Sequence, residues 1–453
     1  MDDDRLPLTW LHSDRFLPRR FLRPVLRFTA VEAAGGLVLL AAAAAALVWA
    51  NLPGGASYER FWETPVDLVL GPLALHESLR GLVDHGLMTI FFFVVGLEIK
   101  REMVRGELRD LKTAALPVLA ALGGMAGPAL VYLAFTGGTT AVHGWAVPVA
   151  TDIAFSLGVL SLLGSRVPVG ARLFLLTLAI ADDIGGIVVI AAFYTSDLAL
   201  WWLLGALGSL AVVWAAGRAG VRAPAFYAAA AFASWLCLLE SGVHPTLSGV
   251  ALALLTPAAA FYTDEQYRDR ARRILGGHEA AAAAPFGGER VDEDALTLAT
   301  VARQSVAPLD RLERVLHPWS SFLVIPLFAL ANSGVRFAGT DFGAAVTHPV
   351  TLGVAVGLVA GKLVGISAST WLAVRLGWGR LPRNTGWRHI LGVAAVAGIG
   401  FTVALFIAGL AFADPALADR AKLGIFAGSL LAGFAGYLFL RLTPAPPRDD
   451  ESA

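Results

Sequence analysis

Residues 178–194 read LAIADDIGGIVVIAAFY, an apolar stretch that carries two adjacent acids, Asp182 and Asp183. A helix of about 20 mostly apolar residues crosses the hydrocarbon of a membrane, and apart from the acids this stretch has that composition. A carboxylate near the centre of a spanning helix costs about 2.5–3.5 kcal/mol on insertion scales. The stretch therefore predicts a membrane-spanning helix whose two acids serve a function.

The rest of the chain also has the composition of a membrane protein. Of its 453 residues 57% are hydrophobic and 15% are charged, and the mean hydropathy is +0.67, which is more apolar than a soluble domain. The pattern predicts an all-α polytopic membrane protein with about twelve transmembrane helices. The predicted spans are 30–50, 85–99, 113–135, 146–163, 171–194, 198–216, 224–240, 244–260, 316–335, 348–371, 388–411 and 422–440.

The basic residues predict the orientation of these spans, because Lys and Arg beside a span tend to stay cytoplasmic. With both termini in the cytoplasm, most of the 35 Lys and Arg residues fall in cytoplasmic segments. The exceptions are Arg60, Arg80, Arg336, Arg420 and Lys422 outside, and Lys362 within a span. The sequence thus predicts a cytoplasmic N-terminal arm (1–28), a membrane transport domain (29–442) and a cytoplasmic tail (443–453).

Two segments of the membrane domain are predicted to lie outside the bilayer. Residues 261–315 are rich in Ala, Gly and charges of both signs, which predicts a flexible cytoplasmic linker between two halves. The external segment 51–84 contains two short apolar runs around Gly71 and Pro72, which allow a β-hairpin. The formal net charge is zero, so nucleic acid is not indicated as a partner.

Four charged residues fall inside predicted spans: Asp152, Asp182, Asp183 and Lys362. Ion pairs that lock helices together are the plainest interpretation, but three acids and one base leave carboxylates without a buried counter-charge. Neighbouring residues of a helix point about 100° apart. We therefore expect one acid of the adjacent pair to line a water-filled cavity and the other to face a neighbouring helix.

These acids have the chemistry of an ion exchanger. Burial and a second carboxylate nearby both disfavour the ionised form of a carboxyl group. A proton and a small hard cation such as Na⁺ or Li⁺, which prefers oxygen ligands, then compete for the same acid. A site that binds either H⁺ or Na⁺, but not both, is the minimum chemistry of an antiporter, and it requires no cofactor.

Two spans carry helix-breaking residues. Pro148 lies four residues before Asp152, and Gly398 and Gly400 lie near the middle of the penultimate span. Small residues also serve close helix packing, which remains an alternative for each segment. Interrupted segments in corresponding positions of two halves indicate inverted repeats with two broken helices that cross at the midplane. Asp152 could neutralise the positive half-helix ends there, and Lys362 the negative ones.

Seven blocks of sequence resemble the bacterial NhaA-type Na⁺/H⁺ antiporters and follow that family's order. They are HGLMTIFFFVVGLEIKRE (85–102), ATDIAFSLGVLSLLG (150–164), LAIADDIGGIVVIA (178–191), GVHPTLSGV (242–250), LHPWSSFLVIPLFALANSGV (316–335), GKLVGI (361–366) and GIGFTVALFIAGLAF (398–412). The resemblance implies the NhaA fold, a location in the bacterial inner membrane, and a homodimer formed through the external segment, which is extended here.

The resemblance also implies roles for single residues at the site. Asp183 would be the principal cation and proton site, and Asp182 its partner, so that the transported Na⁺ meets both. Asp182 would engage Lys362 when the cation is absent. Thr151 and Asp152 would complete the site at the helix crossing.

A second group of residues matches positions where the family senses pH. Glu98, Lys100, Arg101 and Glu102 in GLEIKRE would lie in a cytoplasmic funnel, and His244 would match a histidine tied to the pH profile. A charged helix end and a polar residue at the external rim are the plainer interpretations.

The predicted function is electrogenic, pH-regulated exchange of cytoplasmic Na⁺ or Li⁺ for external protons, two for each cation. The groups that discharge are Asp183 with either Asp182 or Lys362. One alternative is a Na⁺-coupled symporter, which would need more polar side chains for an organic solute. The other, an intramembrane aspartyl protease, lacks the expected Gly-x-Gly-Asp context. The prediction is therefore a transporter and not an enzyme.

Overall fold

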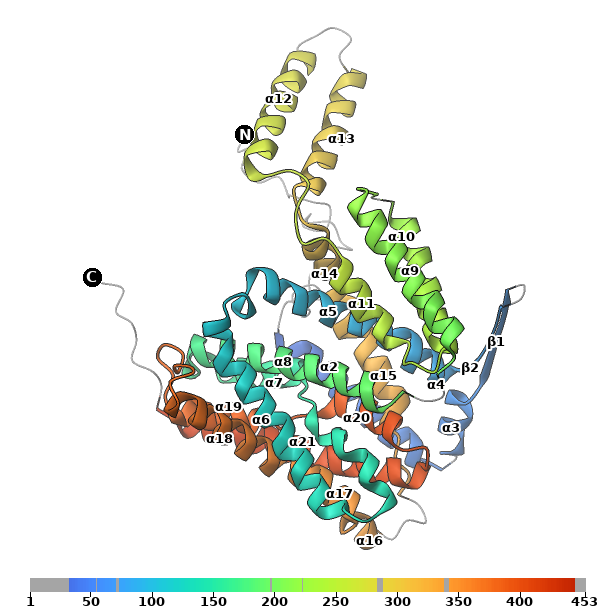
Figure 1. Ribbon diagram of the computed structural model, residues 1–453, viewed down its shortest axis with the longest axis vertical. Coiled ribbons are helices and arrows are strands. Elements are labelled where there is room, and N and C mark those ends of the chain that lie inside the picture. Colours follow the sequence, from blue (N-terminus) through green and yellow to red (C-terminus); the bar gives the residue numbers. More distant parts are fainter. Residues whose placement is uncertain are drawn as a thin grey trace.

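The computed structural model of the chain describes residues 32–53, 55–70, 73–195, 198–221, 223–282, 288–337 and 342–444. The predicted N-terminal arm (1–28) lies outside these residues, and so does the predicted tail from residue 445 onward. The described chain is helical apart from one β-hairpin and the connecting turns (Figure 1).

The described residues contain one sheet, of two strands, and their other elements are helices. The first elements are α2 (Glu32–Asn51), α3 (Ala56–Trp62), β1 (Pro65–Leu70), β2 (Leu73–Ser78), α4 (Leu79–Gly81), η4 (Leu82–Leu87), α5 (Met88–Arg105), η5 (Glu107–Arg109), α6 (Leu111–Thr136), η6 (Thr140–Val149), α7 (Ile153–Leu162), η7 (Gly164–Arg166), α8 (Val169–Phe193), α9 (Leu200–Arg218), α10 (Pro224–Glu240) and α11 (Thr246–Leu255). The remaining ones are α12 (Asp264–Ala282), α13 (Gly288–Gln304), α14 (Pro308–Trp319), η8 (Ser320–Val324), α15 (Ile325–Asn332), α16 (Phe342–Val346), α17 (Pro349–Val356), η9 (Gly357–Gly361), α18 (Lys362–Arg375), α19 (Trp387–Val396), α20 (Phe401–Ala411) and α21 (Pro415–Leu442).

The predicted membrane spans correspond to these helices. In the described chain 8 helices are long and apolar enough to cross a membrane, and the number rises to 10 when each of two bent pairs is counted as one span. The predicted spans 224–240 and 244–260 correspond to the shorter apolar helices α10 and α11, of 17 and 10 residues. The prediction of an all-α polytopic membrane protein is confirmed.

The two bent pairs lie where broken helices were predicted. η6 and α7 meet at 43°, and α19 and α20 meet at 47°. Gly398 and Gly400 fall at the second break, as predicted. The first break comes later than the prediction, because Pro148 lies inside η6 and the chain leaves the helical path only at residues 150–152.

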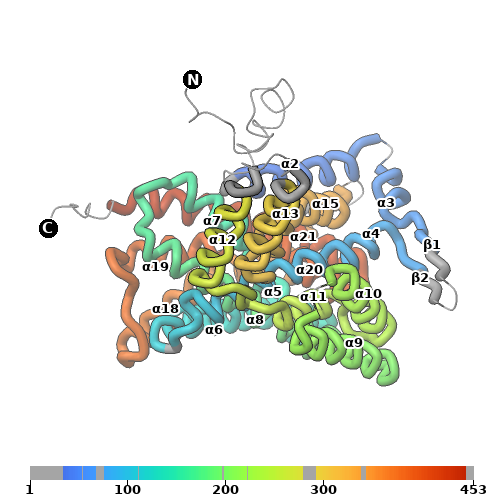
Figure 2. The backbone as a smooth tube through the Cα atoms, turned by 90° about the horizontal axis from the view of Figure 1, so that it is seen from above, coloured from blue at the N-terminus to red at the C-terminus, as the bar shows by residue number. Residues whose placement is uncertain are grey.

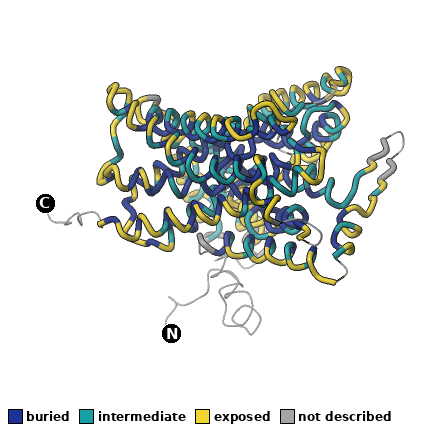
Figure 3. The backbone as a smooth tube through the Cα atoms, turned by 90° about the horizontal axis from the view of Figure 1, so that it is seen from below, coloured by how far each residue is buried: buried dark blue, intermediate teal, exposed yellow. Residues whose placement is uncertain are grey.

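Exposed apolar side chains cover the outside of this helical assembly. Buried residues concentrate in its middle and exposed ones at its periphery (Figure 3). α5, α8 and α20 lie centrally, whereas α9 with the β-hairpin lies at one edge and α18 at the opposite edge (Figure 2). On α9, Trp201 is 86% exposed, as expected of a surface that faces lipid.

Glycines bring α6 very close to the span that contains α18. A Cβ atom on Gly127 of α6 would lie only 3.0 Å from the Cα atom of Gly365 on α18, and one on Gly361 would lie 2.5 Å from the Cα atom of Pro128. Small residues permit such backbone approach between membrane helices. The contact holds Lys362, the first residue of α18, in the interior of the assembly.

Both segments predicted to lie outside the spans contain regular secondary structure. β1 and β2 pair antiparallel with Pro65 opposite Ser78, so the hairpin within 51–84 is present. The segment 261–315, predicted as a flexible linker, contains α12 and α13, which lie side by side and project from the membrane domain, and the first residues of α14 (Figure 1). Alanine favours helix, and Asp264 and Glu265 in the first turn of α12 favour its N-terminus.

Candidate ion-binding site

The two helix breaks meet in the interior, and residues at the first break donate hydrogen bonds to carbonyl oxygens at the end of α19. The Asp152 N–H donates to the Ile399 carbonyl oxygen at 2.7 Å. The Thr151 hydroxyl lies 3.0 Å from the Ala397 carbonyl oxygen, and the Ser156 hydroxyl donates to that of Val396 at 3.2 Å. Carbonyl groups at a helix end lack partners within the helix. The crossing therefore supplies donors to groups that would otherwise be buried without partners.

The Asp152 carboxylate holds the N-terminal ends of two half-helices. Its Oδ1 accepts a hydrogen bond from the Phe155 N–H of α7 at 3.0 Å. Its Oδ2 accepts from the N–H and the hydroxyl of Thr402 on α20, at 3.1 and 2.6 Å. The Ser429 hydroxyl of α21 accepts from two further N–H groups of that end, those of Gly400 and Phe401. A negative side chain is favourable at positive helix ends.

Asp182 and Lys362 form a fully buried ion pair between α8 and α18. The Lys362 Nζ lies 2.5 Å from the Asp182 Oδ2, and both side chains are 0% exposed. The Thr151 hydroxyl lies 2.7 Å from the same carboxylate oxygen and 2.9 Å from the Nζ. Lys362 therefore contacts Asp182 and Thr151. The Thr151 hydroxyl also contacts the Ala397 carbonyl oxygen at the end of α19, and the neutralisation of half-helix ends by Lys362 stays a prediction.

Asp183 differs from its neighbour Asp182 in having no partner within the part of the chain that the structure describes. It is 7% exposed, and neither a hydrogen bond nor an ion pair to it occurs among the described residues. The Asp182 Oδ1 is likewise buried without a partner there. Asp183 lies within electrostatic range of the carboxylates of Asp182, Glu98 and Asp152 and of the ammonium of Lys362.

The unfilled oxygens could hold a small cation or a proton. Oxygen ligands suit hard cations, and the Asp183 carboxylate and the Asp182 Oδ1 are oxygens without a partner in the described chain. Within the described residues no group of three or more His, Cys, Asp or Glu is arranged to hold a metal ion. A transported cation at this place would therefore complete its shell with water or backbone carbonyls.

The charged end of α5 is tied to two other helices. Lys100 donates to the carbonyl oxygens of Leu254 and Thr256 at the end of α11, at 2.7 and 2.5 Å. Arg101 pairs with Glu313 of α14. The Glu102 carboxylate accepts the Glu107 N–H at 3.1 Å. These contacts place three of the four charged residues of GLEIKRE in a network that joins α5, α11 and α14.

Glu98 connects this network with the central acids. It lies one turn before the end cluster on α5, within electrostatic range of Glu313, Arg101 and Glu102 on one side and of Asp183 on the other. A cavity of about 410 Å³ borders the network, and most of its lining residues are charged: Arg101, Asp310, Glu313, Arg314, His317 and Pro318.

His244 lies apart from these groups, in the turn between α10 and α11. Burial lowers the pKa of this imidazole below its ordinary value, and the nearby imidazole of His85 acts in the same direction. The backbone of Tyr194 is its other polar neighbour.

Comparison with known proteins decides the family. The family model described as Na⁺/H⁺ antiporter 1 matches residues 26–440. This chain belongs to the NhaA family of Na⁺/H⁺ antiporters. The chain is similar to the Na⁺/H⁺ antiporter NhaA 2 of Sorangium cellulosum, with 48% identity over 441 residues that cover 97% of this chain and 94% of the relative. It is 49% identical to the NhaA protein of Anaeromyxobacter sp. (strain Fw109-5), over 93% of this chain and 92% of the relative.

Membership of the NhaA family confirms the fold and the transporter class. The chain is a multi-pass membrane transporter of the bacterial NhaA type that exchanges Na⁺ and H⁺, and it is not an enzyme. The protease and symporter alternatives are thereby set aside.

Sequence reasoning missed several residues whose partners become visible only in the fold. Glu313, the partner of Arg101, lies in the segment interpreted as a flexible linker. The leucines of PLDRLERVL (308–316) nevertheless have helical spacing. Asp84 was placed outside the membrane because the second span was predicted to begin at residue 85. The helical run begins at Leu79, and Asp84 accepts a hydrogen bond from Asn332 at 2.6 Å. Ser429 carries no distinguishing signal, because a Ser among small residues is common in membrane helices.

Proposed function

We propose that this NhaA-family antiporter exports cytoplasmic Na⁺ or Li⁺ in electrogenic exchange for external protons, with two protons for each cation. The proposal rests on the different partners of the two adjacent carboxylates, Asp182 and Asp183. Asp182 is held by Lys362 and Thr151, while the adjacent Asp183 has no partner in the described chain. Asp183 is the group for which H⁺ and the cation compete.

In this proposal two protons leave when a cation binds. The monovalent cation replaces one proton at Asp183, which leaves the charge at that residue balanced. The second proton leaves the coupled Asp182–Lys362 pair, from the carboxyl group or from the ammonium, as the Asp182 carboxylate turns to the cation, and the pair becomes net negative. Two protons against one monovalent cation move one net charge in each cycle.

The helix crossing lets the same acids face either side of the membrane. Thr151 touches Asp182, Lys362 and the end of α19, and Asp152 holds α7 and α20 together. A shift of the half-helices therefore changes the surroundings of the ion pair. In the outward-facing state the acids gain external protons and release the cation. In the inward-facing state they lose those protons and bind Na⁺.

The network at the end of α5 is the pH-responsive element in this proposal. Glu98, Lys100, Arg101 and Glu102 couple α5 to α11 and α14, and Glu98 also lies near Asp183. His244 is assigned a part in the pH profile on the resemblance. The excess of Lys and Arg supports a cytoplasmic location of both termini and of the α12–α13 hairpin. The β1–β2 hairpin is the proposed contact of a homodimer in the bacterial inner membrane.

Exchange in inside-out membrane vesicles with an acid interior tests the function. The pH gradient is followed with a dye, and the membrane potential is clamped with K⁺ and valinomycin. We expect Na⁺ and Li⁺ each to dissipate the gradient, and an imposed potential to change the rate. The absence of any response between pH 6.5 and 9 would contradict exchange, and a rate independent of potential would contradict the two-proton stoichiometry.

A further inference from the structure

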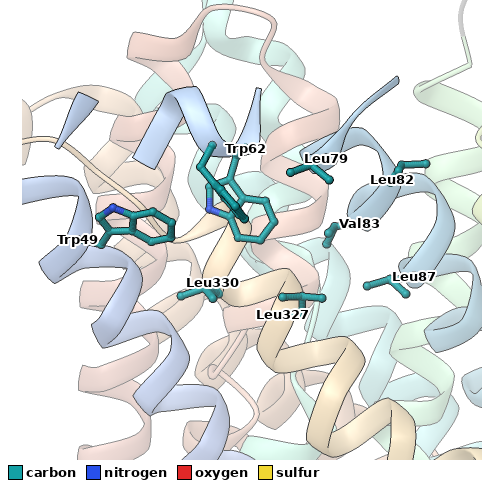
Figure 4. A pocket seen from close by; sticks show the side chains of 9 residues that line it. Trp49, Trp62, Leu79, Leu82, Val83, Leu87, Leu327 and Leu330 are labelled. Carbon is teal, nitrogen blue, oxygen red and sulfur yellow. The ribbon is translucent and has the colours of Figure 1, made fainter. Parts of the chain in front are cut away.

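An apolar cavity of about 520 Å³ lies at the hairpin end of the membrane domain. α2, α3, the α4–η4 segment and α15 form its walls (Figure 4). The Trp62 ring lies between Trp49 on one side and the leucines of α4 and η4 on the other, above Leu327 and Leu330. The cavity shares no residue with the candidate ion site, and its volume lies within the range of small-molecule sites.

Three spans end beside this cavity, which fixes its depth in the membrane. α2 ends two residues after Trp49, α15 ends two residues after Leu330, and the helical run to Arg105 begins at Leu79. Leu87, the lining residue furthest along that run, lies about 12 Å from its start at 1.5 Å per residue. The cavity therefore extends from the membrane–water boundary into one leaflet.

Trp62 in the wall of the cavity and Arg80 beside Leu79 each carry a buried donor without an acceptor among the described residues. Trp62 is 4% exposed, and its Nε1 has no hydrogen-bond acceptor among the described residues. Trp49, by contrast, donates from its Nε1 to the Ser57 hydroxyl at 3.0 Å. Arg80, next to Leu79 in the wall, pairs through its Nη2 with Glu59 at 2.8 Å, but its Nε is also buried without a partner. Buried donors usually have an acceptor, so an acceptor outside the described chain is indicated.

We propose that this cavity binds one membrane phospholipid, with an acyl chain inside it. The glycerol ester carbonyl accepts a hydrogen bond from the Trp62 Nε1, and the phosphate lies at the Arg80 Nε. A phospholipid carries a phosphate, an ester carbonyl and hydrocarbon in one molecule, which matches a guanidinium N–H, an indole N–H and an apolar cavity. Tryptophan is enriched at this level of membrane proteins because its ring is apolar and its N–H is polar.

Native mass spectrometry of the full chain tests the proposal. The protein is stripped of lipid in detergent and titrated with phosphatidylglycerol or phosphatidylethanolamine. Trp62→Phe keeps the ring and removes only the donor, and Leu330→Trp fills the cavity. The matched controls are Trp201→Phe on α9 and Leu430→Trp on α21, both at exposed positions, 86% and 64%.

The expected result is one tightly retained phospholipid in the wild type and in both controls. Leu330→Trp loses it, and Trp62→Phe binds it about tenfold more weakly, as the loss of one hydrogen bond predicts. Unchanged retention in both variants would overturn the proposal. A fall in the dimer fraction of Leu330→Trp with lipid retention unchanged would also overturn it, because the occupant would then be a second copy of the chain. If Leu330→Trp does not fold, the affinity of Trp62→Phe decides.

Discussion

Asp152 and Asp183 are two central acids of this NhaA-family antiporter that differ in their hydrogen-bond partners. Both are buried, with exposed fractions of 3% and 7%. Asp152 accepts hydrogen bonds on both carboxylate oxygens, from α7 and from α20. Asp183 accepts none within the described chain. The first acid is committed to holding broken helices together, whereas the second has its oxygens available for an ion.

The difference shows that burial alone does not identify an ion site in a membrane. An acid at a helix break can be satisfied by N–H groups that the break leaves unpaired. An acid in the middle of the continuous helix α8 meets no such groups, since backbone donors there bond within the helix. Asp182, beside Asp183, needs Lys362 and Thr151 for that reason.

The largest expected effect follows from Asp183→Asn, which keeps the size of the side chain and removes its charge. We expect exchange in vesicles to be abolished and the apparent Tm to be unchanged or raised, because an unpaired buried charge is costly. Asp84→Asn is the control, a half-buried acid that accepts a hydrogen bond from Asn332 outside the site, and should retain exchange. Exchange in a correctly inserted Asp183→Asn protein would show that the free acid is not the ion site.

Lys362→Ala should have the next largest effect. At an effective dielectric constant of 20, two unit charges 4 Å apart attract by about 4 kcal/mol, and loss of this attraction favours the protonated form of Asp182. We expect a weaker apparent Na⁺ affinity and an onset of activity at more alkaline pH, with Lys362→Arg impaired less because it keeps the charge. Rates at several Na⁺ concentrations and pH values measure both. Unchanged affinity and onset in Lys362→Ala would refute a functional ion pair.

Asp152→Asn should affect stability more than transport. An amide has one acceptor, so its NH₂ group would face the Thr402 N–H that Asp152 now accepts. We expect the free energy of unfolding to fall by about 2 kcal/mol, with exchange slowed but present. Thermal unfolding in detergent and vesicle exchange are compared in the same preparation. Loss of all exchange at an unchanged Tm would place Asp152 with Asp183 as an ion ligand.

His244→Gln should have the smallest effect. Burial lowers the pKa of His244 below about 6.5, so the imidazole is already neutral at higher pH, and a neutral glutamine resembles it there. Below that pH the folded protein resists its protonation, so the variant should differ from wild type only on the acid side of the profile. Exchange rates from pH 5.5 to 9 check this. A changed profile above pH 7.5 would show that His244 does not act through its own charge.

The sequence predicted the helical membrane fold because apolar length and basic flanks are local properties. It also predicted the second helix break at Gly398 and Gly400 and the hairpin within 51–84. The α12–α13 hairpin was missed because mixed charge was taken as a sign of flexibility, although charged residues at helical spacing also suit a solvated helix.

The contacts of the site could not be predicted in the same way, because they depend on which helices meet. The hydrogen bond from Thr402 of α20 to Asp152, at the start of α7, joins residues 250 positions apart in the chain. The bond from the Gly400 N–H to the Ser429 hydroxyl joins residues 29 positions apart. Likewise Glu313 reaches Arg101 across 212 positions of the chain. Residue types suggested Asp182 and Lys362 as partners, but only the fold distinguishes the held acid from the free one.

Proton release on cation binding tests the central claim most directly. Purified protein in weakly buffered detergent solution at pH 8.5 is mixed with Na⁺ or Li⁺, and the released protons are counted with a pH dye. We expect wild type and Asp84→Asn to release protons in a saturable manner, approaching two for each bound cation. Asp183→Asn should release none. Saturable release of protons from Asp183→Asn, at a wild-type level, would contradict the assignment of Asp183 as the group for which H⁺ and Na⁺ compete.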